Sequence, residues 1–174
     1  MKKIILLIVL MVFLACAYFI SLGPNYDSID ISEALSVARS TLKDNQEIIV
    51  FDSKNPFNFH DIFKNMENVA DQQVFGVLTK PNEKDVFPVI MGVAGSAGWG
   101  EHHYGYLDRY LNMGFATFSL HSFKSRNVES TVGEQVSVTM PMMIHDAFMA
   151  LKALSKDSQI DVNRAGLTGW SLGG

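Results

Sequence analysis

The strongest feature of the hydrophobic pattern is a continuous apolar segment, residues 4–22, which follows Lys2 and Lys3. Residues 4–14 have the length of the hydrophobic region of a secretory signal peptide, and residues 15–17, Ala-Cys-Ala, form a small-x-small cleavage site. The whole segment is also long enough to span a bilayer as an uncleaved anchor. A buried globular helix is a poor alternative, because the segment is apolar on every face.

A third interpretation of this segment is a lipoprotein signal. The letters FLAC at residues 13–16 resemble a bacterial lipobox, although Phe13 stands where leucine is usual. In all three interpretations the two lysines stay inside and the rest of the chain is exported. Residues 1–23 are therefore predicted to be a signal peptide or membrane anchor. The protein is expected in the periplasm or outside the cell, free or held at the inner membrane.

Residues 24–68 form an N-terminal extension with weaker patterning. Asp30 and Glu33 have the spacing of a capping box, so a short helix is expected over residues 30–43. Residues 47–51 follow as a strand, and the polar stretch after them is expected to be a loop with one helical turn. The apolar face of the helix consists of Leu35, Ala38 and Leu42.

From residue 69 onward, short apolar runs alternate with segments of helical periodicity. Gly114 can end the first helix in the left-handed conformation, and Pro141 can start the second. This alternation is typical of βαβ units, so residues 69–174 are predicted to form an α/β domain with a largely parallel sheet and flanking helices. The expected strands are residues 73–81, 89–94, 115–120 and 165–169, the expected helices residues 101–114 and 141–154, and residues 155–164 an intervening turn.

The composition of the chain argues against several classes of function. The chain has 174 residues, 48% of them hydrophobic, which is enough for one domain with a buried core. Its formal net charge of −4 includes no basic excess, so nucleic acid is not an expected partner. One cysteine cannot form an intramolecular disulfide, and no Cys/His cluster has zinc spacing. The sequence contains neither G-x-x-x-x-G-K-S/T nor G-x-G-x-x-G, so no metal or cofactor is predicted.

The end of the sequence, Gly169-Trp170-Ser171-Leu172-Gly173, fits the pattern G-x-S-x-G of a nucleophile elbow. In such an elbow the serine sits on a sharp strand-to-helix turn, and the glycines let strand and helix approach each other. The turn exposes the hydroxyl and directs the following amide into an oxyanion hole. We interpret Ser171 as a candidate catalytic nucleophile, Leu172 as an oxyanion donor, and Gly169 and Gly173 as elbow glycines. An ordinary glycine turn is the alternative.

A second oxyanion donor is expected in the loop Gly95-Ser96-Ala97-Gly98, which follows the predicted strand at residues 89–94. An oxyanion hole needs two backbone N–H groups that converge on one oxygen, and small residues permit the close approach. We assign this N–H to Ser96, with Ala97 as the alternative. A phosphate-binding loop is a weaker interpretation, because the phosphate-binding patterns are absent.

Several of these segments together resemble a known family. The segments VFGVLTKP, FPVIMGVAGSAG, YLDRYLNMGFATFSLHSFKSR and DVNRAGLTGWSLGG, within residues 73–174, look like the N-terminal half of an α/β-hydrolase of the dienelactone hydrolase group. The resemblance implies an incomplete α/β-hydrolase fold and hydrolysis of an ester or related acyl bond of a small molecule, through an acyl-enzyme. The enzymes that name the group use a cysteine nucleophile, where this chain has Ser171. They often carry His-Gly where it has Ala94-Gly95.

In this fold the catalytic triad runs serine, acid, histidine along the chain, so the acid and the histidine are expected after Ser171. The upstream histidines are not expected to substitute: His145, beside Asp146, lies in the second predicted helix, and His60 and His121 lie in loops. The remaining two, His102 and His103, follow the oxyanion loop and could border the site. The strand ending at Gly169 should also be central in its sheet. We therefore expect the sequence to be the N-terminal part of a longer serine hydrolase, inactive by itself.

Two other functions remain compatible with the sequence. One is a membrane-tethered, non-catalytic module that has the hydrolase scaffold and binds a ligand or partner. The other is a truncated, inactive remnant. An acyltransferase on the same scaffold would differ from a hydrolase only in excluding water.

Overall fold

The computed structural model describes residue 11, residues 27–82 and residues 85–174. The predicted signal peptide or anchor therefore lies outside the described residues, apart from Met11. In the described part of the chain, no helix combines the length and the apolar composition needed to cross a membrane.

The described residues form one five-stranded sheet with the strand order β1-β2-β4-β3-β5. Strand β2 runs antiparallel to both of its neighbours, β1 and β4, whereas β3 runs parallel to β4 and to β5. The bounds are Gln46–Lys54 for β1, Asp71–Thr79 for β2, Phe87–Val93 for β3, Ala116–Leu120 for β4 and Ile160–Gly169 for β5.

The sheet is therefore mixed, and the prediction of a largely parallel sheet applies only to β4, β3 and β5. The reason lies in the connections. A helix follows β3 and another follows β4, and such crossovers return the chain to the start of a parallel neighbour. The connection between β1 and β2, residues 55–70, returns the chain without a crossover and so gives an antiparallel pair.

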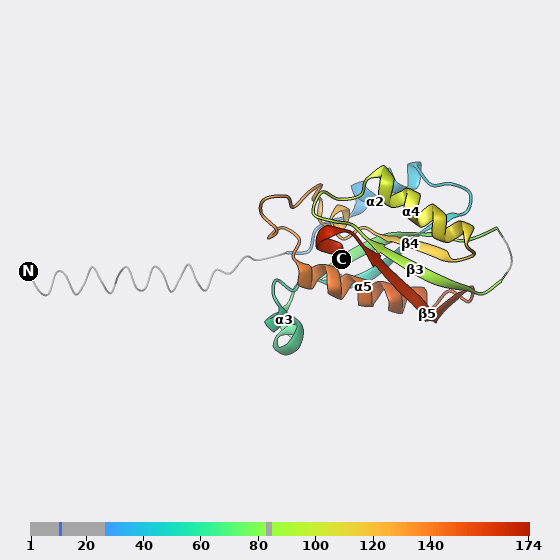
Figure 1. The fold of residues 1–174 in the computed structure, drawn as a ribbon. Helices are drawn as coiled ribbons and strands as arrows, with labels where there is room; N and C mark the ends of the chain where they lie inside the picture. The colour runs from blue at the N-terminus through green and yellow to red at the C-terminus, as the bar shows by residue number, and fades with distance from the viewer. Residues whose placement is uncertain (1–10, 12–26, 83–84) are drawn as a thin grey trace, which may run out of the picture.

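Helices cover both faces of the sheet. Figure 1 shows α2 (Ser32–Ser40) and α4 (Glu101–Asn112) on one face and α5 (Met140–Leu154) on the other. The short helix α3 (Phe59–Lys64) lies in the connection between β1 and β2. Three single turns of 3-10 helix complete the described elements: η1 (Met66–Asn68), η2 (Lys124–Arg126) and η3 (Ser171–Gly173).

The main hydrophobic core lies between the sheet and α5. Phe118 and Leu120 of β4 pack there with Met142 of α5, and all three are almost fully buried. The intervening residues of β4, Thr117 and Ser119, line the opposite face, below α2 and α4. Side chains of a strand point alternately to the two faces of the sheet, so β4 presents apolar residues to the layer of α5 and polar residues to the layer of α2 and α4.

The predicted helices and strands are confirmed in kind, and several bounds change. β5 begins at Ile160, so half of the predicted turn at residues 155–164 is strand. His60 lies in α3 and not in a loop. The Asp30 carboxylate accepts hydrogen bonds from the Ser32 N–H at 3.0 Å and from the Ser32 hydroxyl at 2.6 Å. These bonds form a local turn ahead of α2, whose N-cap is Ile31, so the predicted capping box with Glu33 is not formed.

Candidate active site

The sequence G-x-S-x-G forms a sharp turn between β5 and the single helical turn η3. β5 ends at Gly169, and the Trp170 N–H donates to the Val93 carbonyl oxygen at 3.2 Å, which holds the turn against the end of β3. Ser171 has a φ of +53°, the left-handed region that a residue with a side chain rarely adopts. Such a backbone costs about 1–3 kcal/mol and persists only where the surroundings enforce it.

The glycines of the turn are required by close backbone contacts. A Cβ added to Gly169 would overlap the carbonyl group of Gly173, and one added to Gly173 would overlap the carbonyl oxygens of Val93 and Ala94. These backbones therefore approach more closely than any residue with a side chain allows. The positions of Gly169 and Gly173 agree with those that the elbow pattern predicts.

The predicted oxyanion loop lies directly beside the elbow. A Cβ added to Gly95 would come within 2.7 Å of the Trp170 carbonyl oxygen and 3.1 Å of the Ser171 Cβ. The Gly98 N–H donates to the Gly95 carbonyl oxygen at 2.9 Å, which closes the loop into a tight turn. The Ser96 carbonyl oxygen accepts from the Thr131 N–H at 2.8 Å, so a second segment of the chain holds the loop in place.

Backbone N–H groups are left free at the place where the oxyanion hole is predicted. Within the described residues, the N–H groups of Leu172, Ser96 and Ala97 have no hydrogen-bond acceptor. Ser96 is half-buried, whereas Ala97 is exposed. Leu172 is partly buried and packs against the main core, which fixes its backbone. The assignment of Leu172 as one oxyanion donor, and of Ser96 or Ala97 as the second, stays a prediction.

An aromatic cluster surrounds the side chain of Trp170. The ring centroid of Trp170 lies 4.6 Å from that of His103, 5.9 Å from that of Trp99 and 6.1 Å from that of Tyr106. The Trp99 indole N–H donates to the Leu120 carbonyl oxygen at 2.9 Å, which ties the cluster to the end of β4. The residue before Ser171 is thus held by rings from α4 and from the loop that precedes it.

His103 has a structural role in this cluster. Its Nδ1 accepts the Gly100 N–H at 2.9 Å at the start of α4, so the neutral ring carries its proton on Nε2. Burial lowers the pKa of His103, and the neighbouring His102 lowers it further. His103 therefore borders the elbow through Trp170, as the sequence suggests, whereas His102 is exposed and contacts the ring of His103. Within the described residues, no histidine or carboxylate forms a hydrogen bond with Ser171, whose side chain is exposed.

The pair His145 and Asp146 lies in α5, as predicted, on the sheet face opposite α4. The Ser53 hydroxyl donates to Asp146 Oδ1 at 2.6 Å and lies 3.0 Å from His145 Nδ1. Burial lowers the pKa of His145, against the smaller opposing effect of the Asp146 charge. These contacts bind α5 to β1 and give neither residue access to Ser171.

His121 is more deeply buried than its predicted position in a loop suggests. It directly follows β4 and is only 6% exposed, with its ring stacked on Phe75 at a centroid distance of 5.1 Å. Its Nε2 lies 3.3 Å from the Ser119 hydroxyl, whereas its Nδ1 has no partner within the described residues. Burial lowers the pKa of His121 to about 3, with a smaller effect from Lys124. The period-two series Thr117, Ser119, His121 predicts that these residues share one face of the sheet, but it does not predict the burial of the ring.

Mild acid should destabilise the protein through His121. The ordinary pKa of histidine is 6.5 and that of folded His121 is about 3, so between these values the unfolded state binds a proton that the folded state does not. As pH falls below 6.5, this residue should lower the free energy of unfolding by up to about 1.4 kcal/mol per pH unit. Urea denaturation of the parent and of His121→Phe, from about pH 7 to about pH 4, measures the difference.

The variant His121→Phe should show a shallower loss of stability than the parent over this range. His60→Gln is a matched control, because His60 is exposed in α3, and it should keep the slope of the parent. Equal slopes for the parent and His121→Phe would contradict a buried, neutral His121.

Comparisons with known proteins find similar structures but no similar sequence or family model. No protein-family model matches the chain, and no curated protein matches it in sequence. A dienelactone hydrolase-like promiscuous phosphotriesterase from metagenomic libraries is 14% identical, with a TM-score of 0.46 over 74% of this chain and 51% of its own. A cold-adapted esterase from an Arctic intertidal metagenomic library is 14% identical, with a TM-score of 0.47 over 75% and 53%.

A thermostable esterase from Pseudomonas putida is 19% identical, with a TM-score of 0.44 over 83% of this chain and 42% of its own. By their names, these proteins are dienelactone hydrolase-like and esterase proteins, the group that the sequence resembles. The chain spans about half the length of the first two. All three TM-scores lie below 0.5, so the geometry of this chain alone carries the functional proposal.

Proposed function

We propose that the chain is part of an α/β-hydrolase that cleaves an ester or related acyl bond of a small molecule, with Ser171 as the nucleophile. The observation that carries this proposal is the left-handed backbone of Ser171, at a φ of +53°, between two glycines that admit no side chain. An ordinary glycine turn would place glycine, not serine, at the strained position. A strained serine at the end of a strand of a partly parallel sheet is the context that a nucleophile elbow requires.

The proposed reaction uses the groups that meet at the elbow. The Ser171 Oγ attacks the acyl carbon and passes its proton to a general base, while the N–H groups of Leu172 and Ser96 hold the oxyanion. The leaving group departs with that proton and leaves an acyl-enzyme, which water hydrolyses to the acid. In the α/β-hydrolase order the acid and the histidine follow the serine. The proposal therefore requires both residues after Ser171 in the whole protein.

A covalent probe tests the proposal. The protein made from its complete reading frame is treated with fluorophosphonate-biotin, and the modified peptide is identified by mass spectrometry. We expect one adduct on Ser171, because only an activated serine reacts rapidly. Heat-denatured protein is the control and should not react. A folded protein that stays unlabelled would contradict the hydrolase and favour the non-catalytic binding module.

We also propose that the protein is exported, with residues 1–23 as the signal. The support is the sequence of two lysines followed by a continuous apolar segment. Export places the elbow outside the cytoplasm, so the substrate would be a periplasmic or extracellular ester. The mass of the mature N-terminus distinguishes cleavage after Ala17, lipidation at Cys16 and an intact anchor. Recovery of the intact chain in the soluble cytoplasmic fraction would overturn export.

A further inference from the structure

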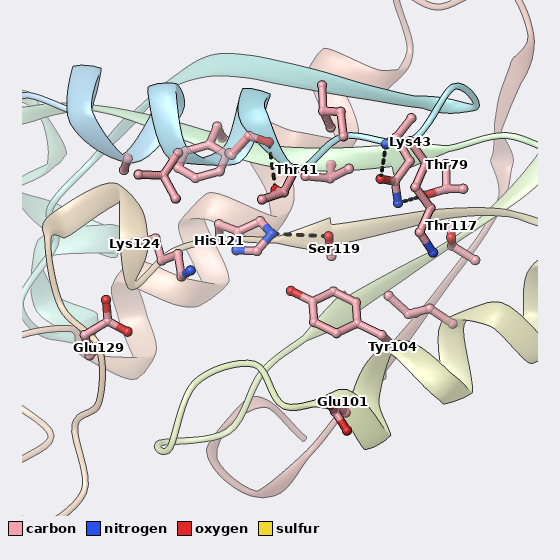
Figure 2. A pocket seen from close by; sticks show the side chains of 18 of the residues that line it. Thr41, Lys43, Thr79, Glu101, Tyr104, Thr117, Ser119, His121, Lys124 and Glu129 are labelled. Carbon is pink, nitrogen blue, oxygen red and sulfur yellow. Dashed lines mark hydrogen bonds between the residues drawn. The ribbon is translucent and has the colours of Figure 1, made fainter.

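A cavity lies away from Ser171, on the sheet face that carries α2 and α4. It has a volume of about 880 Å³ and lies between these two helices, over β2 and β4. Figure 2 shows it with the side chain of Tyr104 on one side and those of His121 and Ser119 facing it. We call this cavity the α2–α4 cleft. Ser171 and Leu172 do not line it.

The floor of the α2–α4 cleft is apolar along β2, where Phe75 and Val77 line it, but polar along β4, which is unusual for a strand that helices cover on both faces. Thr117, Ser119 and His121 form the polar part from β4 and the residue that follows, and Thr79 adds a hydroxyl from β2. The Gln46 side-chain amide donates to the Thr79 hydroxyl at 3.3 Å. Within the described residues, the Thr117 hydroxyl takes part in no hydrogen bond and is open to the cleft, whereas His121 Nδ1 is unpartnered but sealed from it. A polar group that helices cover normally has a partner, so the Thr117 hydroxyl points to an occupant with polar atoms.

The walls of the cleft are mostly hydrocarbon. From α2, the side chains of Ala34, Val37 and Ala38 face it. From α4, Leu107 and the ring of Tyr104 close the opposite side, and Figure 2 shows the Tyr104 hydroxyl directed toward His121. A molecule that fits between these walls therefore presents a hydrocarbon face to the helices and hydrogen-bonding groups to the floor.

The charged residues of the cleft lie at its rim. All six are exposed, and four are acidic against two lysines. None of these six residues is buried, so a charged ligand deep in the cleft would lose its hydration without a buried partner. An anion would in addition meet the net negative rim. The six residues are Glu33, Lys43, Glu101, Asp108, Lys124 and Glu129.

We propose that the α2–α4 cleft binds an uncharged amphiphile, a molecule with a hydrocarbon body and a hydroxyl or carbonyl group. The polar group contacts the floor at Thr117 and Ser119, and the hydrocarbon lies along α2. This site goes beyond the proposed hydrolase and does not depend on it, because no group of the elbow takes part.

Isothermal titration calorimetry tests this binding with a matched pair of probes, 1-decanol and decanoate, on the protein made from its complete reading frame. Both probes have the same hydrocarbon length, and only decanoate carries a charge at pH 7. We expect 1-decanol to bind at one site and decanoate to bind at least about tenfold more weakly, because the cleft offers its carboxylate no buried cation.

Gly105 provides a blocking variant with its own control. It lies in α4, lines the cleft, and a Cβ added to it meets no atom within 4 Å. Gly105→Trp should therefore fill the cleft without disturbing the fold and abolish binding of 1-decanol, whereas Gly105→Ala should bind it as the parent does. Val37→Trp, from the exposed part of the opposite wall, is a second blocking variant. Thr117→Val keeps the shape of the side chain and should weaken binding about three- to tenfold.

Three results would overturn the proposal. A folded protein that gives no heat with 1-decanol would mean that the cleft holds water only. If decanoate bound as tightly as 1-decanol, the cleft would not select uncharged ligands. Unchanged binding by both folded tryptophan variants, Gly105→Trp and Val37→Trp, would place the ligand elsewhere.

Discussion

Replacing Ser171 with alanine should lower kcat/KM for hydrolysis of p-nitrophenyl esters by about 10⁴- to 10⁶-fold, the effect of removing the nucleophile from a serine hydrolase. The reason is local. Ser171 is exposed at the apex of the turn, and the free N–H groups of Leu172 and Ser96 remain in the variant. Those donors still stabilise an oxyanion, but no oxygen is positioned to attack the acyl carbon. Stopped-flow or steady-state release of p-nitrophenolate measures the loss.

Ser96→Ala is the matched control for this experiment. Ser96 is proposed to act through its backbone N–H, which alanine keeps, and no hydrogen bond of its hydroxyl is present among the described residues. Its activity should stay within a few-fold of the parent. Substantial hydrolysis by Ser171→Ala, together with unchanged labelling by the fluorophosphonate probe, would show that the nucleophile lies elsewhere.

Replacing Asp146 with alanine should destabilise the protein by about 3–5 kcal/mol, the cost of leaving a buried charge without its partner. Asp146 is fully buried, and its two carboxylate oxygens accept from the Arg126 guanidinium at 2.7 Å and 3.1 Å. Arg126 also donates to Asn55 Oδ1 at 2.8 Å and to the Ser122 carbonyl oxygen at 2.9 Å. These bonds, with one from Arg126 to the Lys54 carbonyl oxygen at 3.2 Å, join β1, η2 and α5. An arginine cannot lose its proton to relieve the charge.

Chemical denaturation measures this loss, which is a large part of the 5–15 kcal/mol that stabilises a typical domain. Asp161→Ala is the control. Asp161 pairs with Arg164 at 2.6 Å, but the Arg164 side chain is 57% exposed. An exposed pair contributes about 1 kcal/mol or less, so Asp161→Ala should change stability by no more than that. Equal losses for the two variants would contradict a structural role for the buried pair.

The elbow is the part of the candidate site that the sequence predicts most completely. G-x-S-x-G follows a strand, and the structure shows why each glycine is needed: a side chain at Gly169 or Gly173 would overlap the backbone of η3 or of β3. The requirement at Gly169 is local, because it involves only the turn, whereas Gly173 must also clear Val93 and Ala94 at the end of β3. The spacing of the pattern already contains both glycines.

Contacts between distant segments account for what the sequence does not predict. Nothing in the residues around His121 indicates that its ring will be enclosed by Phe75 and Trp99, which lie on other elements. The pairing of Arg126 with Asp146 likewise depends on the placement of η2 against α5. The α2–α4 cleft depends on how far apart two helices come to lie over the sheet, although the polar series on β4 is visible in the sequence.

The sequence by itself determined the kinds and approximate limits of the helices and strands, the α/β class and the position of the elbow. Periodicity, helix caps and glycine spacing are local properties, and each acts within a few residues. Only the tertiary structure decided the strand order, the antiparallel placement of β2, the burial of His121 and the presence of the α2–α4 cleft. These features depend on which distant segments pack together, and the free energy of that packing belongs to the whole fold.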